Sequence, residues 1–157
     1  MKVKDFMITD VIFANKEDTI KNVMKIMVDK KIGGVPIIDD KGILVGIISD
    51  GDIIRSINPK DGKMYDLISY AFYLKKEELE DDIELIKDTN IMTIAKHKNI
   101  YCVYPEDTME KVLSIFSKHN LKKIPVINKD RKVVGVISRG DVIRYIQKKI
   151  IDKLWFV

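Results

Sequence analysis

Two short stretches of the chain place a serine at the end of an apolar run and an aspartate three residues later. The first reads GIISDGDIIR and contains Ser49 and Asp52; the second reads GVISRGDVIR and contains Ser138 and Asp141. In each stretch a β-prone run gives way to an amphipathic pattern, which predicts a strand followed directly by a helix. The serine and the aspartate would both lie at the start of that helix.

Two interpretations of this pair remain open. A serine with an acid three residues later is a capping box, which satisfies the free amides of a helix start. Gly51 and Gly140, however, fall in the first turn, where glycine costs up to about 1 kcal/mol relative to alanine and capping does not require it. A glycine allows a ligand to approach the backbone closely, and the free amides of a helix start bind anions. An aspartate one turn later is placed to bind ribose hydroxyls, so the alternative is a nucleotide site.

Both stretches belong to a longer internal repeat. The offset of 89 residues that relates Ser49 to Ser138 (138 − 49) also relates Pro36 to Pro125, and residues 11–57 align with 100–146 without a gap. Two copies are too few for a solenoid, so the repeat predicts a pseudo-symmetric pair of units.

Each unit predicts the element order β-α-β-β-α, and the fold class is therefore α/β (α+β), with a helical insert between the repeats. The first helix of each unit follows the capping types Asp18-Thr19 or Asp107-Thr108, the latter with Glu110 in a capping-box position. The strands are expected at 11–14, 35–38 and 44–48, and at 100–104, 124–127 and 133–137. The expected boundaries are 1–57 for the first repeat, 58–89 for the connecting segment and 90–157 for the second repeat.

The connecting segment is expected to form two helices that cover core edges, or that act as a lid or a partner-binding element. Its candidate residues for the latter roles are aromatic: Tyr65, Tyr70, Phe72 and Tyr73. The C-terminal apolar face, ending at Trp155 and Phe156, is expected to dock on the core or on a second subunit.

Composition argues against several function classes. The net charge is +4 with a pI near 9.0, and lysines and arginines alternate with acids, which disfavours nucleic-acid binding. No apolar run is long enough for a membrane span, and the N-terminus lacks the pattern of a secretory signal. Cys102 is the single cysteine, which favours a reducing, cytoplasmic setting. His97 and His119 lack zinc-site spacing, and the sequence contains no phosphate-binding glycine loop of a nucleotide-hydrolysing enzyme, so we expect no metal, no required cofactor and no catalysis.

In both copies, a helix start with an acid and a threonine comes first, an apolar strand with a proline follows, and Gly-x-x-Ser-x-x-Asp comes last. This duplicated pattern resembles the CBS domain pair, or Bateman module. The resemblance covers about residues 3–57 and 90–149. It implies two β-α-β-β-α repeats packed sheet to sheet in a pseudo-twofold arrangement, with two clefts between them. Such clefts take adenosine-containing ligands, and these modules are regulatory homodimers rather than enzymes.

The resemblance also implies residue roles: serine binds phosphate, aspartate binds ribose, and the opposite repeat supplies the base-binding strand. One site would use Ser138, Gly140 and Asp141 with Ile12, Gly33, Gly34 and Pro36, and the other Ser49, Gly51 and Asp52 with Tyr101, Lys122, Lys123 and Pro125. Beside the serines, Asp50 should repel a phosphate and Arg139 should attract one, so we expect unequal affinities. Lys122 and Lys123 also fit an ordinary solvated helix end.

The sequence therefore predicts a stand-alone regulatory protein that senses AMP, ADP or ATP and signals to a target protein or through its own dimer. The alternatives are a sensor of S-adenosylmethionine or a cyclic dinucleotide, and a ligand-independent dimerisation or docking module.

Overall fold

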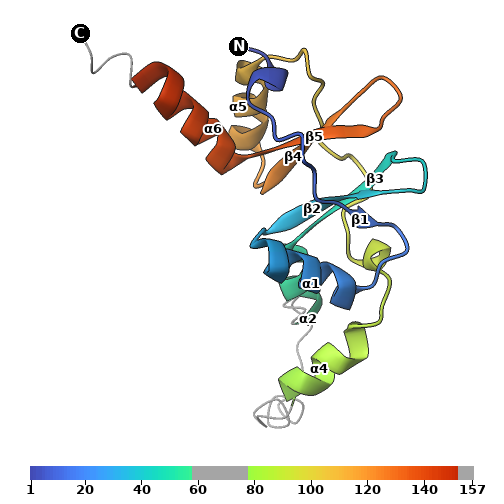
Figure 1. Cartoon of the computed structure of the whole chain (residues 1–157). Coiled ribbons are helices and arrows are strands. Elements are labelled where there is room, and N and C mark those ends of the chain that lie inside the picture. The colour runs from blue at the N-terminus through green and yellow to red at the C-terminus, as the bar shows by residue number, and fades with distance from the viewer. Residues whose placement is uncertain (58–77, 152–157) are drawn as a thin grey trace.

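The computed structural model describes residues 1–57 and 78–151 (Figure 1). The first repeat contains, in order, β1 (Ala14–Asn15), α1 (Ile20–Lys30), β2 (Gly34–Ile38), β3 (Leu44–Ser49) and α2 (Asp50–Ile57). Helix α4 (Glu78–Ile86) follows, and the second repeat then contains α5 (Met109–Lys118), β4 (Lys123–Ile127), β5 (Val133–Ser138) and α6 (Arg139–Ile146). A π-helical turn, Gln147–Ile151, continues α6. The predicted α/β fold of two similar repeats is confirmed.

The first strand of each repeat is shorter than predicted. Only Ala14 and Asn15 pair with β2, in parallel, and in the second repeat Val103 alone forms a bridge to Val126 of β4. The N–H of Val11 donates to the carbonyl of Thr9 at 3.0 Å, so the chain turns locally before it reaches the edge of β2. Of the two apolar runs, only Ala14 and Val103 are buried, whereas Phe13, Tyr101 and Tyr104 are exposed.

Threonine side chains cap α1 and α5. Oγ1 of Thr19 accepts from the N–H of Asn22 at 3.3 Å, and Oγ1 of Thr108 accepts from the N–H of Lys111 at 3.4 Å. Asp107 instead accepts from the N–H of Tyr104, three residues before it. The capping box predicted for Asp107 and Glu110 is therefore wrong, because the aspartate side chain points back into the preceding loop.

Two antiparallel hairpins form the centre of the molecule (Figure 1). In the first, Gly34 pairs with Ser49 and Pro36 with Ile47; in the second, Lys123 pairs with Ser138 and Pro125 with Val136. The two hairpin tips are joined by backbone hydrogen bonds from Leu44 N to Arg131 O at 3.0 Å and from Val133 N to Gly42 O at 3.2 Å. Each Ser-x-x-Asp therefore lies at the far end of its hairpin, away from these joined tips.

Each repeat completes its hydrophobic core with the segment that begins the other repeat. Val3 and Phe6, from the N-terminal 3₁₀ turn Val3–Asp5, pack with Val103, Val112 and Ile137 of the second repeat. Ile91 and Ala95, from the 3₁₀ turn Ile91–Thr93 and the residues after it, pack in the core of the first repeat. Figure 1 accordingly shows the N-terminal segment beside α5. The two cores are thus tied together by exchanged segments.

Of the two helices predicted for the connecting segment, α4 matches the second, and it lies against α2. Ile83 and Ile86 are half-buried, as their spacing predicted, and Ile86 packs against the first core. The aromatic candidates of the segment, Tyr65, Tyr70, Phe72 and Tyr73, and the C-terminal Trp155 and Phe156 lie outside the described residues.

Candidate functional site

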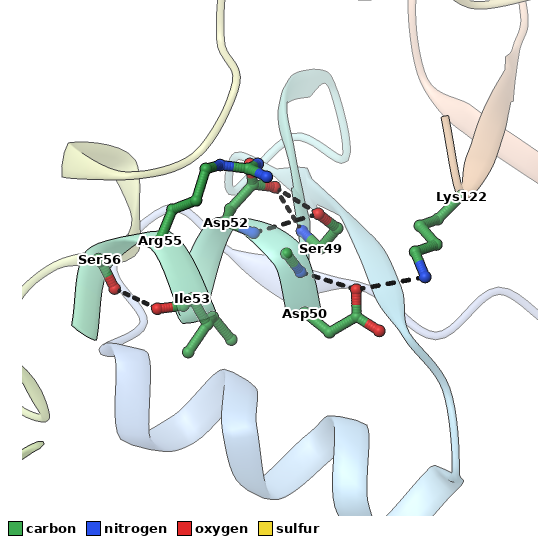
Figure 2. Close-up of polar contacts among 8 residues, drawn as sticks. Ser49, Asp50, Asp52, Ile53, Arg55, Ser56 and Lys122 are labelled. Atoms are coloured by element: carbon green, nitrogen blue, oxygen red, sulfur yellow. Dashed lines mark hydrogen bonds and ion pairs between the residues drawn. The ribbon is translucent and has the colours of Figure 1, made fainter. Parts of the chain in front are cut away.

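The start of α2 holds a closely bonded group of three side chains (Figure 2). Asp52 Oδ2 accepts from the backbone N–H of Ser49 at 2.8 Å and from its hydroxyl at 2.7 Å, and Ser49 Oγ accepts from the N–H of Asp52 at 3.4 Å. The other oxygen of Asp52, Oδ1, accepts from Nη2 of Arg55 at 2.5 Å. Ser49 and Asp52 therefore form a capping box, and an arginine one turn further on pairs with its acid.

The start of α6 repeats this arrangement. Asp141 Oδ2 accepts from the N–H of Ser138 at 2.8 Å and from its hydroxyl at 2.6 Å, and Asp141 N donates to Ser138 Oγ at 3.2 Å. Arg144 forms the ion pair with Asp141 Oδ1. The side chain of Asp141 is only 8% exposed, against 21% for Asp52. The two sites thus share one architecture but differ in the burial of the acid.

The arginines were missed from the sequence, although both quoted stretches end in one. Arg55 and Arg144 are related by the offset of 89 residues (144 − 55), and each lies three residues after the aspartate. Residues three apart on a helix are neighbours, so a repeated Asp-x-x-Arg is a detectable sign of an ion pair.

The arginines also account for the space above the two glycines. A Cβ added at Gly51 would lie 3.3 Å from Nη1 of Arg55, and one added at Gly140 would lie 3.3 Å from Nη1 of Arg144. The sequence predicted that something approaches the backbone at these glycines, and in this structure the nearest group is the guanidinium. A guanidinium at a helix start lies where an anion would bind, since free amides and a positive charge face the same space.

Asp50 connects the first site to the opposite repeat. Its Oδ1 accepts from the N–H of Gly51 at 2.7 Å and lies 3.7 Å from Nζ of Lys122, which precedes β4 (Figure 2). Its backbone N–H donates to the carbonyl of Gly33 at 3.1 Å. Of the residues expected opposite Ser49, Lys122 is therefore brought to that helix start.

An aromatic pair lies at a further contact between the repeats. The rings of Tyr101 and His119 stack with centroids 4.0 Å apart, and Nζ of Lys96 lies 5.0 Å from the centroid of Tyr101. Lys96 exchanges backbone hydrogen bonds with Ile47, two residues before Ser49. Tyr101 therefore lies close to the strand that leads into the first site, with its ring engaged by His119, which also ends α5.

Other predicted site residues contact their own repeat. Gly34 lies opposite Ser49, and Lys123 lies opposite Ser138, although the resemblance assigned each of them to the other site. Burial lowers the pKa of Lys123, an effect that the nearby carboxylate of Asp141 opposes. Pro36 and Pro125 are buried within the hairpins, and Ile12 packs partly buried against the first core.

The two duplicated regions match the family model of the CBS domain, at residues 3–59 and 89–148. The chain belongs to the CBS domain family. Each CBS repeat contains one Ser-x-x-Asp helix start, and the described part of the pair includes no group of three or more His, Cys, Asp or Glu side chains that could hold a metal ion. No helix in residues 1–57 and 78–151 is both long and apolar enough to cross a membrane.

Among curated proteins, the chain is 28% identical over 152 residues to the uncharacterized protein MJ1426 of Methanocaldococcus jannaschii, covering 91% of this chain and 89% of that protein. It is 27% identical over 146 residues to homoserine O-acetyltransferase of Methanohalobium evestigatum, covering 93% of this chain but only 24% of the enzyme. The CBS pair thus matches a whole small protein in one case and about a quarter of a larger enzyme in the other.

Two solved structures share the fold over nearly their whole length. The CBS domain pair of protein MJ0100, in complex with 5′-methylthioadenosine and S-adenosyl-L-methionine, superposes with a TM-score of 0.70 at 24% identity, covering 95% of this chain and 98% of that one. CBSX2 in complex with AMP superposes with a TM-score of 0.72 at 20% identity, with the same coverage. At these identities the likeness establishes the fold of the CBS pair.

Proposed function

We propose that this CBS pair is a regulatory sensor of adenosine-containing ligands, with one ligand site at each Ser-x-x-Asp helix start. The observation that carries the proposal is the duplicated group of serine, aspartate and arginine at the starts of α2 and α6, with Lys122 reaching the first group from the opposite repeat. Structural neighbours with this fold bind AMP, 5′-methylthioadenosine and S-adenosylmethionine.

The chemistry of each group fits a nucleoside. In a liganded state, the ribose hydroxyls would donate to the aspartate, and the serine hydroxyl and the first-turn amides would donate to the 5′ group. In this structure each serine hydroxyl donates to the aspartate and each arginine pairs with it, so ligand binding would redirect these hydrogen bonds. The arginine would then either bind the anionic group of the ligand or remain paired with the aspartate.

Regulation would follow from ligand contacts with both repeats, and Lys122, which reaches Asp50 from the opposite repeat, supports this at the first site. A ligand that binds groups from both repeats favours the arrangement in which those groups fit it best, and it can shift the equilibrium only by its difference in affinity, about 1–3 kcal/mol. The response would pass to a target protein or through a homodimer. AMP, ADP and ATP are the ligands we propose first, and S-adenosylmethionine or a cyclic dinucleotide second.

Calorimetry on the purified protein with AMP, ATP and S-adenosylmethionine tests this proposal, together with native mass spectrometry for any retained ligand. We expect binding with at least one ligand, at micromolar affinity or about −8 kcal/mol. Asp52→Asn and Asp141→Asn should each weaken binding of the ligand held at their own helix start, whereas Asp40→Asn, in the exposed turn of the first hairpin, should weaken neither. No heat and no thermal shift with any of these ligands would contradict the proposal and favour a ligand-independent docking module.

A further inference from the structure

The two helix starts differ most at the residue that follows the serine. Asp50 follows Ser49, and Arg139 occupies the equivalent position after Ser138, at the repeat offset of 89 (139 − 50). Asp50 Oδ1 accepts from the N–H of Gly51 at 2.7 Å. In the first site, a carboxylate of the chain itself therefore occupies an amide that would otherwise be free to bind a phosphate.

Two contacts hold the carboxylate of Asp50 in this position. Gly51 donates to it, and Nζ of Lys122 lies 3.7 Å away (Figure 2). A Cβ added at Gly33 would lie only 2.8 Å from its Oδ2. Glycine at position 33 leaves room for the carboxylate, while Lys122, which the sequence suggested as a source of positive charge for a ligand, is paired with Asp50. An incoming phosphate would meet a fixed negative charge whose counter-ion is already engaged.

The second helix start has an excess of positive charge. Its charged side chains are Arg139, Asp141, Arg144, paired with Asp141, and Lys123, which lies opposite Ser138. Together they carry a formal charge of +2, whereas Asp50, Asp52, Arg55 and Lys122 at the first site sum to zero. Arg139 is exposed and lies in the first turn of α6, where Asp50 lies in α2.

We infer that the two sites select different 5′ groups on an adenosine ligand. The Ser138 site takes a 5′-phosphorylated nucleotide, and the Ser49 site takes an adenosine derivative whose 5′ group is uncharged or positively charged, such as a nucleoside, a thioether or a sulfonium. This inference rests on the proposed function, and it adds that one chain binds two classes of adenosine ligand at the same time.

Adenosine and AMP are a matched pair of probes because they differ only in the phosphate. For the wild-type protein, calorimetry should give one AMP per chain, lost in Asp141→Asn and kept in Asp52→Asn. Adenosine should still bind to Asp141→Asn through the Ser49 site. In Asp50→Ala, which removes both the charge and the acceptor of the Gly51 N–H, the AMP stoichiometry should rise from one to two, and Asp40→Ala should leave it at one.

Arg139→Gln tests the same inference from the other repeat. Loss of a charge-assisted contact to phosphate should weaken AMP binding by about tenfold and leave adenosine binding unchanged. Thermal unfolding of each variant separates loss of binding from loss of folding, and the two variants act in different repeats. Two equal AMP sites in the wild type, or an unchanged AMP stoichiometry in folded Asp50→Ala, would overturn the inference but leave the proposed function standing. Absence of binding by both probes would overturn the proposed function as well.

Discussion

Lys96 and Ile47 exchange two backbone hydrogen bonds, 3.0 Å from Lys96 N to Ile47 O and 2.9 Å from Ile47 N to Lys96 O. Ile8 and Val136 form the matching pair in the other half, with both bonds at 2.9 Å. Each pair joins the first segment of one CBS repeat to the last strand of the other repeat. The outer edges of β3 and β5 are therefore bridged by chain from the partner repeat, which protects them from pairing with other molecules.

The first prediction concerns the exchanged core residues. Ile91 is fully buried in the first core although it belongs to the second repeat, so Ile91→Ala should destabilise the protein by about 2–5 kcal/mol. Leu85→Ala is the matched control, because this side chain is 79% exposed and its loss should change the free energy of unfolding by less than about 0.5 kcal/mol. Urea unfolding measures both. A small effect of Ile91→Ala would show that the exchanged segment is not part of the core in solution.

Two glycines should respond in opposite ways to alanine. A Cβ at Gly34 would lie 3.1 Å from the carbonyl oxygen of Ile48, which is fixed in the hairpin, so Gly34→Ala should cost about 1–3 kcal/mol. At Gly51 the nearest group is the flexible guanidinium of Arg55 at 3.3 Å, so Gly51→Ala should be neutral or stabilising by up to about 1 kcal/mol. Thermal unfolding of the two variants without ligand distinguishes the sites. A Gly51→Ala variant less stable than Gly34→Ala would contradict the conclusion that a Cβ fits at position 51 but not at position 34.

The two capping aspartates should differ in their contribution to stability. Asp141 is buried and Asp52 is partly exposed, and each accepts hydrogen bonds from its serine. Removing a buried acceptor leaves donors without partners at a cost of about 1–3 kcal/mol, so Asp141→Ala should destabilise the protein more than Asp52→Ala. Denaturant unfolding at neutral pH measures the difference. If the two variants lose equal stability, the greater burial of Asp141 has no energetic consequence.

The N-terminal segment is expected to give the protein part of its acid sensitivity. Glu106 accepts from Nζ of Lys2 at 2.5 Å and Nζ of Lys4 at 2.7 Å, and these lysines lower its pKa from 4.5 to about 2. Because the folded-state pKa is depressed, the stabilisation is present above the unfolded pKa and is lost as the pH falls towards 2. The unfolding temperature of Glu106→Gln should therefore lie below that of wild type at pH 6, and the two should converge near pH 2.

Glu17→Gln is the control for this measurement, since Glu17 is exposed and its Oε1 lies 3.9 Å from Nζ of the neighbouring Lys16. The unfolding temperature of Glu17→Gln should follow that of wild type across this pH range. A Glu106→Gln curve that runs parallel to wild type down to pH 2 would show that the contacts with Lys2 and Lys4 do not contribute.

The constant offset of 89 residues was sufficient to predict the duplicated fold, because β2, β3 and α2 have copies of matching polarity at most positions that pack; Gly34 with Lys123 and Ser56 with Tyr145 are exceptions. The exchange of Val3 and Ile91 was not predicted, since these residues are related by 88 positions (91 − 3) and fall outside the gap-free alignment. Their surroundings, VKDFM and IMTIA, share apolar spacing but almost no identical residues. Such spacing indicates burial without indicating which core receives the side chain.

At the candidate site, the sequence predicted the helix starts and, as one of two interpretations, the capping boxes of Asp52 and Asp141, but not their ion pairs with arginine; the resemblance placed Lys122 at the first site. Arg55 was overlooked because an arginine on an amphipathic helix usually faces solvent. The hairpin register also places Gly34 opposite Ser49 and Lys123 opposite Ser138, contacts that depend on the turn between the strands. The assignment of Gly34 to the Ser138 site and of Lys123 to the Ser49 site stays a prediction.

The exchanged segments also constrain the order of folding during synthesis. The core of the first repeat needs Ile91 and Ala95, so a nascent chain that ends before residue 95 holds an incomplete hydrophobic interior. Val3 and Phe6, although made first, find their buried positions only after Ile137 and Val142 have emerged from the ribosome. The first interior can therefore close only after residue 95 has been translated and the second only after residue 142, and a ribosome-bound fragment would expose apolar surface to chaperones until then.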